Sequence, residues 1–224
     1  MKLLNAKYNF SMELRENFVD ILVIEKPSLM SELIMDMQKQ CDGEEGEWVL
    51  AEETKILQIN KHICFLLDPF SYDINNRKML SILYKQLEQQ AFDFYEEKGN
   101  INSQIISVMD NIIEHMPYSA VSYNLELSWT SLFKLYDMKF DAECNSLLEK
   151  LIEVVKILSA LHQYDILCLV NIKSYLEAEE LMYLYEMAFY NKIYLVLLEN
   201  TENIANNYEN FYIMDKDLCF IRKS

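Results

Sequence analysis

The sequence has little glycine and no long apolar run, and each shortage excludes a class of protein. Three glycines in 224 residues argue against a glycine-rich phosphate-binding loop, in which backbone N–H groups must approach the phosphates closely. No apolar run approaches the roughly 20 residues of a membrane span, and Met1–Tyr8 lacks the apolar core of a signal peptide. We therefore expect a cytoplasmic protein that is not associated with a membrane.

Basic residues and paired cysteines are also scarce. The five cysteines are an odd number and include no C-x-x-C pair, so we expect thiols of a reducing compartment. The 36 acidic side chains outnumber the 20 basic ones, for a formal net charge of −16. Because such a surface repels phosphate at long range, any nucleic-acid contact must use a local basic patch.

Short apolar runs at both ends of the chain predict strands. Residues 7–14 alternate between apolar and polar, whereas Val19–Ile24 is almost continuously apolar, which is typical of a strand covered on both faces. A helix is predicted after Pro27. Further strands are predicted at 48–59, 62–67, 165–170, 193–198 and near Tyr212 and Phe220, with a helix at 178–189. This order indicates an α/β fold with a mainly parallel sheet.

The middle of the chain has a helical pattern. From about Asn75, apolar residues recur with a period of 3.6, and one such stretch, from Asp141 to His162, predicts a long amphipathic helix. The sequence thus predicts an α/β head domain formed by residues 1–75 and 165–224, interrupted by an inserted α-helical domain at residues 76–164.

Catalytic motifs are few. Gly43 and Gly46 lie among acidic residues, and the turn after Ile24 contains no glycine, so we do not expect a working nucleoside triphosphatase. Asp68 ends a predicted strand and Asp73 follows it, which leaves open a divergent metal-dependent hydrolase or nuclease that uses both carboxylates. The alternative is that these acids cap the next helix.

Four lysines of the helical insertion are candidates for a basic patch: Lys134, Lys139, Lys150 and Lys156. On the residues alone, a solvated face of mixed charge is the default interpretation. A third hypothesis is that the amphipathic helices build a purely protein-interacting scaffold.

Four segments carry a resemblance to a known family: Phe18–Glu25, Phe65–Asn76, Gln86–Gln90 and Ile166–Leu176. In their order and spacing they are similar to the type II-A CRISPR-associated adaptation proteins of the Csn type. The resemblance implies an α/β head like a degenerate P-loop NTPase with an inserted helical leg. It also implies a non-catalytic homotetrameric ring that binds double-stranded DNA near free ends, binds calcium, and works beside the CRISPR integrase complex and effector nuclease.

The resemblance also suggests site residues. Lys134, Lys139, Lys150 and Lys156 match lysines of a relative and are therefore expected to face DNA without reading bases. Calcium prefers several oxygen ligands. Within the stretch 118–126, Glu126 matches an acid of the family, and Asn124 can supply a further oxygen. Asp110 and Glu114 on the preceding helix complete the candidate calcium ligands.

Overall fold

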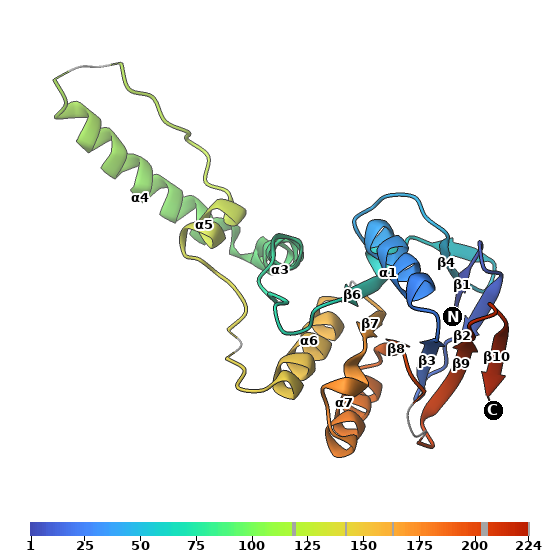
Figure 1. Ribbon diagram of the computed structural model, residues 1–224. Helices are drawn as coiled ribbons and strands as arrows, with labels where there is room; N and C mark the ends of the chain where they lie inside the picture. The colour runs from blue at the N-terminus through green and yellow to red at the C-terminus, as the bar shows by residue number, and fades with distance from the viewer. Residues whose placement is uncertain (118–119, 142, 163, 203–205, 224) are drawn as a thin grey trace. The chain divides into compact units, whose positions relative to one another are not determined.

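A computed structural model describes residues 1–117, 120–141, 143–162, 164–202 and 206–223 of the chain (Figure 1). The chain forms two compact units. Unit 1 comprises Met1–Asp73 and Ala142–Ser224, and unit 2 comprises Ile74–Asp141. The sequence placed the second boundary at residue 164, but residues 142–164 belong to unit 1. The reason is that α6 (Leu147–Leu161) packs against α7 (Ala178–Tyr190) of that unit.

Unit 1 is organised around a six-stranded sheet of order β10-β9-β3-β8-β7-β6. The strands are β3 (Val19–Ile24), β6 (Ile63–Leu66), β7 (Ile166–Val170), β8 (Tyr194–Glu199), β9 (Glu209–Met214) and β10 (Phe220–Lys223). All neighbours are parallel except β9 and β10, which are antiparallel. The mainly parallel sheet agrees with the prediction, and every residue of β3 is buried, as expected for a strand covered on both faces.

A second sheet was not predicted. The strands β1 (Lys2–Asn5), β2 (Phe10–Glu13), β4 (Trp48–Glu52) and β5 (Lys55–Leu57) form a four-stranded sheet of order β2-β1-β4-β5, in which every pair is antiparallel. One face of this sheet is solvated, since buried and exposed residues alternate along β2. The alternation in residues 7–14 thus marked the half-buried strand correctly, but not the sheet to which it belongs.

Helices and the second sheet enclose the core of unit 1. The helices are α1 (Pro27–Cys41), α2 (Ile59–His62), α6, η2 (Ile172–Ser174) and α7. One core cluster joins Leu29 and Leu33 of α1 with Leu22 of β3 and Trp48 of β4. On the opposite face of the large sheet lie α6 and α7 (Figure 1). Local signals define the helix ends: Ser146 caps α6, and Glu177 and Glu180 form a capping box on α7.

Unit 2 is helical and has a small interior. Its elements are α3 (Arg77–Gln90), η1 (Ala91–Phe94), α4 (Tyr95–Glu114) and α5 (Trp129–Leu135). The side chain of Asn76 caps α3, and that of Ser128 caps α5. Asn75 exchanges hydrogen bonds of 3.1 and 2.9 Å with the backbone of Phe140, which ties the two ends of the unit together. None of the residues of α4 is buried.

Few turns of the chain use glycine. Gly43 is the glycine with a positive φ, at +94°. Eight other described residues adopt positive φ, among them Asn17, His162 and Lys192. A left-handed conformation costs roughly 1–2 kcal/mol for residues other than glycine, so these turns carry backbone strain in a glycine-poor sequence.

Among the described residues, no helix has both the length and the apolar character needed to cross a membrane.

Candidate nucleic-acid interface

The four candidate lysines are divided between the two units. Lys134 lies in the last turn of α5 and Lys139 in the loop that follows, both in unit 2. Lys150 and Lys156 lie on α6, which belongs to unit 1. The expectation that all four share one inserted helical domain is therefore wrong, because the apolar face of α6 is buried in the head.

Three of these lysines already have acceptors. Lys139 pairs with Asp137 and Lys156 with Glu153, each at 2.6 Å, and these hydrogen bonds raise the pKa of both ammonium groups. Lys150 donates to the carbonyl oxygen of Phe70 at 2.6 Å. The two exposed ion pairs, of Lys139 and Lys156, are weak in water, so a phosphate can replace their carboxylates at low cost.

Lys134 has a different environment. It lines a groove of about 670 Å³ between α3 and α5, together with Arg77 and Lys85 of α3. Residues 77, 81, 85 and 88 recur at intervals of three or four and therefore share one polar stripe of α3. This spacing is the sequence signal for Arg77 and Lys85, which are not among the site residues expected from the sequence.

The candidate calcium ligands do not converge within the chain. The Asp110 carboxylate accepts a hydrogen bond of 2.6 Å from the Tyr123 hydroxyl, and the Asn124 side chain accepts one of 3.0 Å from the backbone of Glu126. Glu114 is the last residue of α4. Tyr118 and Ser119 lie outside the described residues. Among the residues that the structure describes, no three His, Cys, Asp or Glu side chains are grouped to hold a metal ion, so these candidates do not by themselves form the set of oxygen donors that Ca²⁺ prefers.

Asp68 stabilises its own loop. It follows β6, and its Oδ1 accepts hydrogen bonds from the backbone of Phe70 at 2.9 Å and of Ser71 at 3.3 Å. The Ser71 hydroxyl and these amides lower the pKa of the Asp68 carboxyl. Asp68 and Asp73 are candidates from the sequence for capping the next helix, but the residue whose side chain caps α3 is Asn76.

The carboxyl end of β3 has no room for a phosphate-binding loop. Only Glu25 and Lys26 separate β3 from α1, and no side chain caps the first turn of α1. Gly46 lies after α1, outside this connection, and is close to the side chains of Asp36 and Gln40. A Cβ atom there would be 2.4 Å from Oδ1 of Asp36. The connection after β3 therefore cannot wrap a triphosphate as a Gly-rich loop does.

Unit 1 contains buried ionisable side chains that no sequence motif indicates. Lys173 pairs with Glu209 at 2.8 Å, and their side chains are 6% and 1% exposed. Tyr185 donates to the same Glu209 oxygen at 2.8 Å. Glu199 accepts a hydrogen bond of 3.2 Å from the backbone of Lys173, and burial raises the pKa of Glu199 to about 7. This network joins β8, η2, α7 and β9 and serves to hold the head together.

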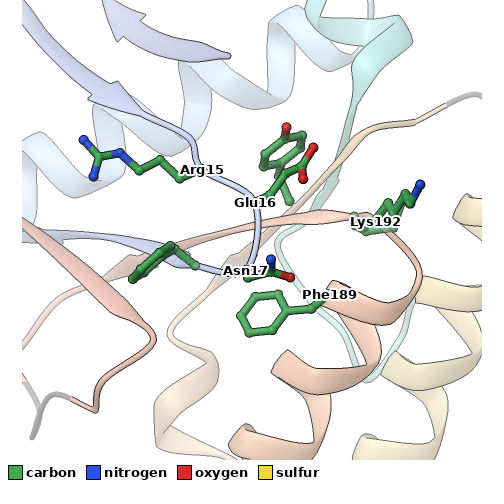
Figure 2. A pocket seen from close by; sticks show the side chains of 8 residues that line it. Arg15, Glu16, Asn17, Phe189 and Lys192 are labelled. Carbon is green, nitrogen blue, oxygen red and sulfur yellow. The ribbon is translucent and has the colours of Figure 1, made fainter.

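A small pocket lies at the amino-terminal edge of the large sheet. It is lined by Arg15 to Phe18, which precede β3, and by Phe189 and the residues Lys192 to Tyr194 around the start of β8 (Figure 2). Its volume of about 80 Å³ is below the roughly 300 Å³ of small ligand sites. In α/β sheets ligands bind at the carboxyl ends of the strands, so this pocket does not support a nucleotide site.

Comparison with known proteins identifies the family. A model of the CRISPR-associated protein family Cas_Csn2 matches residues 40–218. The chain belongs to the Csn2 family of CRISPR-associated proteins. Similar curated proteins are the CRISPR-associated protein Csn2 of Streptococcus agalactiae, 23% identical over 90% of this chain and 89% of that protein, and that of Enterococcus faecalis, 24% identical over 80% of each.

A solved structure supports the same fold. The crystal structure of Stu0660 of Streptococcus thermophilus superposes with a TM-score of 0.61 over 96% of this chain and 75% of that one, at 16% identity. The Csn2 relationship predicted from the four segments is thus confirmed. The mixed α/β architecture is confirmed as well, since the present chain has two sheets and flanking helices.

Proposed function

We propose that the chain is a non-catalytic protein that binds double-stranded DNA near its ends and supports spacer acquisition in a type II-A CRISPR system. In this proposal four copies form a ring, and the ring works beside the CRISPR integrase complex and the effector nuclease. The observation that carries the proposal is membership of the Csn2 family over residues 40–218.

The head supports a structural rather than a catalytic role. We propose that it is a degenerate relative of the P-loop NTPases, in which the phosphate loop is reduced to Glu25 and Lys26. Asp68, the acid best placed for metal-assisted hydrolysis, is engaged by its own loop. The sheet then acts as a platform for assembly, and the helical unit serves as the proposed leg.

Charge distribution supports DNA binding inside a ring. A chain with a formal net charge of −16 repels nucleic acid over most of its surface. A ring reconciles this charge with DNA binding if Lys134, Lys139, Lys150 and Lys156 line its inner face. Contacts of lysine with phosphate carry no base information, so binding is expected to be independent of sequence and to weaken steeply with salt.

A gel-shift comparison tests the proposal. Linear duplex should be shifted in the gel by the protein, and closed circular duplex of the same sequence should bind more weakly because it offers no ends. Charge reversal of Lys139, Lys150 and Lys156 should weaken binding to linear DNA while the oligomer stays intact. Failure on both DNA forms, with calcium present, would overturn the proposal. Unchanged affinity of the charge-reversed protein would instead favour a protein-interaction scaffold.

The ring and the calcium dependence are tested by native mass measurement. Four copies are expected, and added calcium is expected to shift the equilibrium toward the tetramer. Because Asp110, Glu114, Asn124 and Glu126 do not form a site within one chain, we propose that they bind calcium only in the assembled ring. The alternative of a divergent hydrolase is tested by Asp68→Ala: loss of an ATPase or nuclease activity in pure protein would contradict a non-catalytic role.

A further inference from the structure

A groove between α3 and α5 contains three cations. Arg77 and Lys85 approach it from α3, and Lys134 approaches it from α5. All three side chains belong to exposed residues. The groove also contains Tyr84, Glu88 and Thr130, and all of its lining residues lie within unit 2. It is thus a feature of one compact body.

The groove is built firmly. Tyr84 and Phe133 pack with their ring centroids 6.1 Å apart and hold α3 against α5. Tyr84 also donates a hydrogen bond of 3.1 Å to the carbonyl oxygen of Met138. Because both aromatic residues are buried, the cations are presented from a packed scaffold rather than from a loose loop.

The charges of the groove are not balanced by ion pairs. Among the described residues, Arg77, Lys85 and Lys134 have no carboxylate within the 4.0 Å of an ion pair. The one acid of the lining, Glu88, accepts hydrogen bonds from the backbone and the hydroxyl of Thr130. Lys139 and Lys156, in contrast, each have a carboxylate partner. The groove therefore has an excess of positive charge in an acidic protein.

The spacing of the cations suits an extended polyanion. Arg77 and Lys85 are eight residues apart, which corresponds to about 12 Å along an α-helix. One DNA strand advances about 3.4 Å per nucleotide, so this span covers three to four phosphates. A single small anion would engage only part of the groove. Arginine adds a planar fork of donors that suits phosphate oxygens.

From this geometry we infer that the α3–α5 groove of unit 2 is a binding site for the DNA phosphate backbone, with Arg77 and Lys85 as contact residues alongside Lys134. This inference rests on the proposed function and makes it more specific. It makes Arg77, Lys85 and Lys134 the primary contacts with DNA phosphates. Lys139 and Lys156 are secondary contacts, because each must first break its ion pair with a carboxylate.

The test compares two double variants that remove the same charge. Arg77→Gln with Lys85→Gln alters the groove, whereas Lys78→Gln with Lys98→Gln alters two basic residues of unit 2 outside its lining. Binding to linear duplex is measured at several salt concentrations. Removing two phosphate contacts is expected to weaken binding about tenfold or more near 0.15 M salt. It should also reduce the salt slope by about 2 for each protomer engaged.

Three outcomes can be distinguished. Loss of affinity and slope in the groove variant, with both retained in the matched control and partly restored by Arg77→Lys, supports the inference. Equal effects of the two variants on DNA binding would overturn the inference and point to a general charge effect. Normal DNA binding by a groove variant that no longer assembles would also overturn it and would point to a protein contact. If the wild-type protein binds no DNA, the proposed function fails and this inference fails with it. Circular dichroism verifies that each variant retains its helices.

Discussion

The two compact units differ in how they treat their apolar side chains. In unit 1, β3, β7 and almost all of β8 are buried, and Leu195 to Leu198 are 0% exposed. In unit 2, α4 has five apolar side chains that are 38% to 57% exposed: Ile101, Ile105, Val108, Met109 and Ile112. The sheet unit thus supplies its own burial, whereas α4 gains little from the unit to which it belongs.

Charged side chains follow the same division. Lys173 and Glu209 are buried as a pair within unit 1, together with the carboxyl of Glu199. Arg77, Lys85 and Lys134 of unit 2 face an open groove. Buried pairs hold elements together, while exposed cations are available to partners. The comparison shows that unit 1 buries its apolar core and an ion pair, whereas unit 2 leaves apolar side chains of α4 and the groove cations exposed.

The largest expected effect comes from breaking the buried pair. Lys173→Met should lower the free energy of unfolding by about 3–5 kcal/mol, because it leaves the Glu209 charge buried without its partner. Urea denaturation provides the measurement. The matched change Lys139→Met removes an exposed pair of unit 2 and should leave stability unchanged. Restoration of stability by adding Glu209→Gln would confirm the cause, whereas equal losses in the two single variants would contradict the proposed division.

The next largest difference between the units is expected in the stability cost of truncating an apolar side chain. Leu197→Ala, at a site that is 0% exposed, should cost about 2–5 kcal/mol in unfolding free energy. Ile112→Ala, at a site that is 56% exposed, should cost less than about 0.5 kcal/mol in dilute protein. If copies cover α4 in an oligomer, the cost of Ile112→Ala rises with protein concentration. A large cost that does not depend on concentration would show that α4 is covered within one chain.

Sequence patterns predicted the elements whose periodicity reports local burial. The run Val19–Ile24 coincides with β3, and the predicted helix at 178–189 is one residue shorter than α7. The continuous apolar run of β3 reports burial on both faces, and the helical period of α7 reports one buried face, so neighbours in the sequence are sufficient to reveal both patterns. The same applies to α6, although its leucine stripe could not show that it packs against the head instead of extending the insertion.

Pairings between distant segments could not be predicted. The strand β1 has only four residues, of mixed polarity, and finds its partner β4 more than 40 residues later. Lys173 lies in a short polar turn that resembles a surface loop, yet pairs with Glu209 in the interior. The groove cations Arg77 and Lys134 come from helices separated by the whole of α4. Each of these features depends on tertiary contacts that leave little local trace.

The smallest expected difference between the units is in how their stability depends on pH. Burial raises the pKa of Asp20 to about 6 and that of Glu199 to about 7, both in unit 1. One oxygen of each carboxyl has no hydrogen-bond partner among the described residues. The ordinary values are 3.8 and 4.5, so the folded state favours the neutral carboxyls. Their stabilising contribution is therefore complete below about pH 4 and is lost as the pH rises through 6 and 7.

Amide substitutions remove this titration and test its sign. Asp20→Asn and Glu199→Gln imitate the neutral carboxyls, so each variant should be more stable than the wild type at pH 8, by roughly 2–3 kcal/mol. Near pH 4 the difference should vanish. Urea denaturation at both pH values gives the measurement, and Asp93→Asn in the exposed η1 turn of unit 2 is the control that should retain the wild-type pH profile. Because each native carboxyl has an oxygen without a partner, the amide nitrogen can take that position without breaking a bond present in the wild type. Wild-type and variant profiles that stay parallel from pH 4 to 8 would mean that these acids are charged inside the sheet, and that unit 1 tolerates buried charge beyond the Lys173–Glu209 pair.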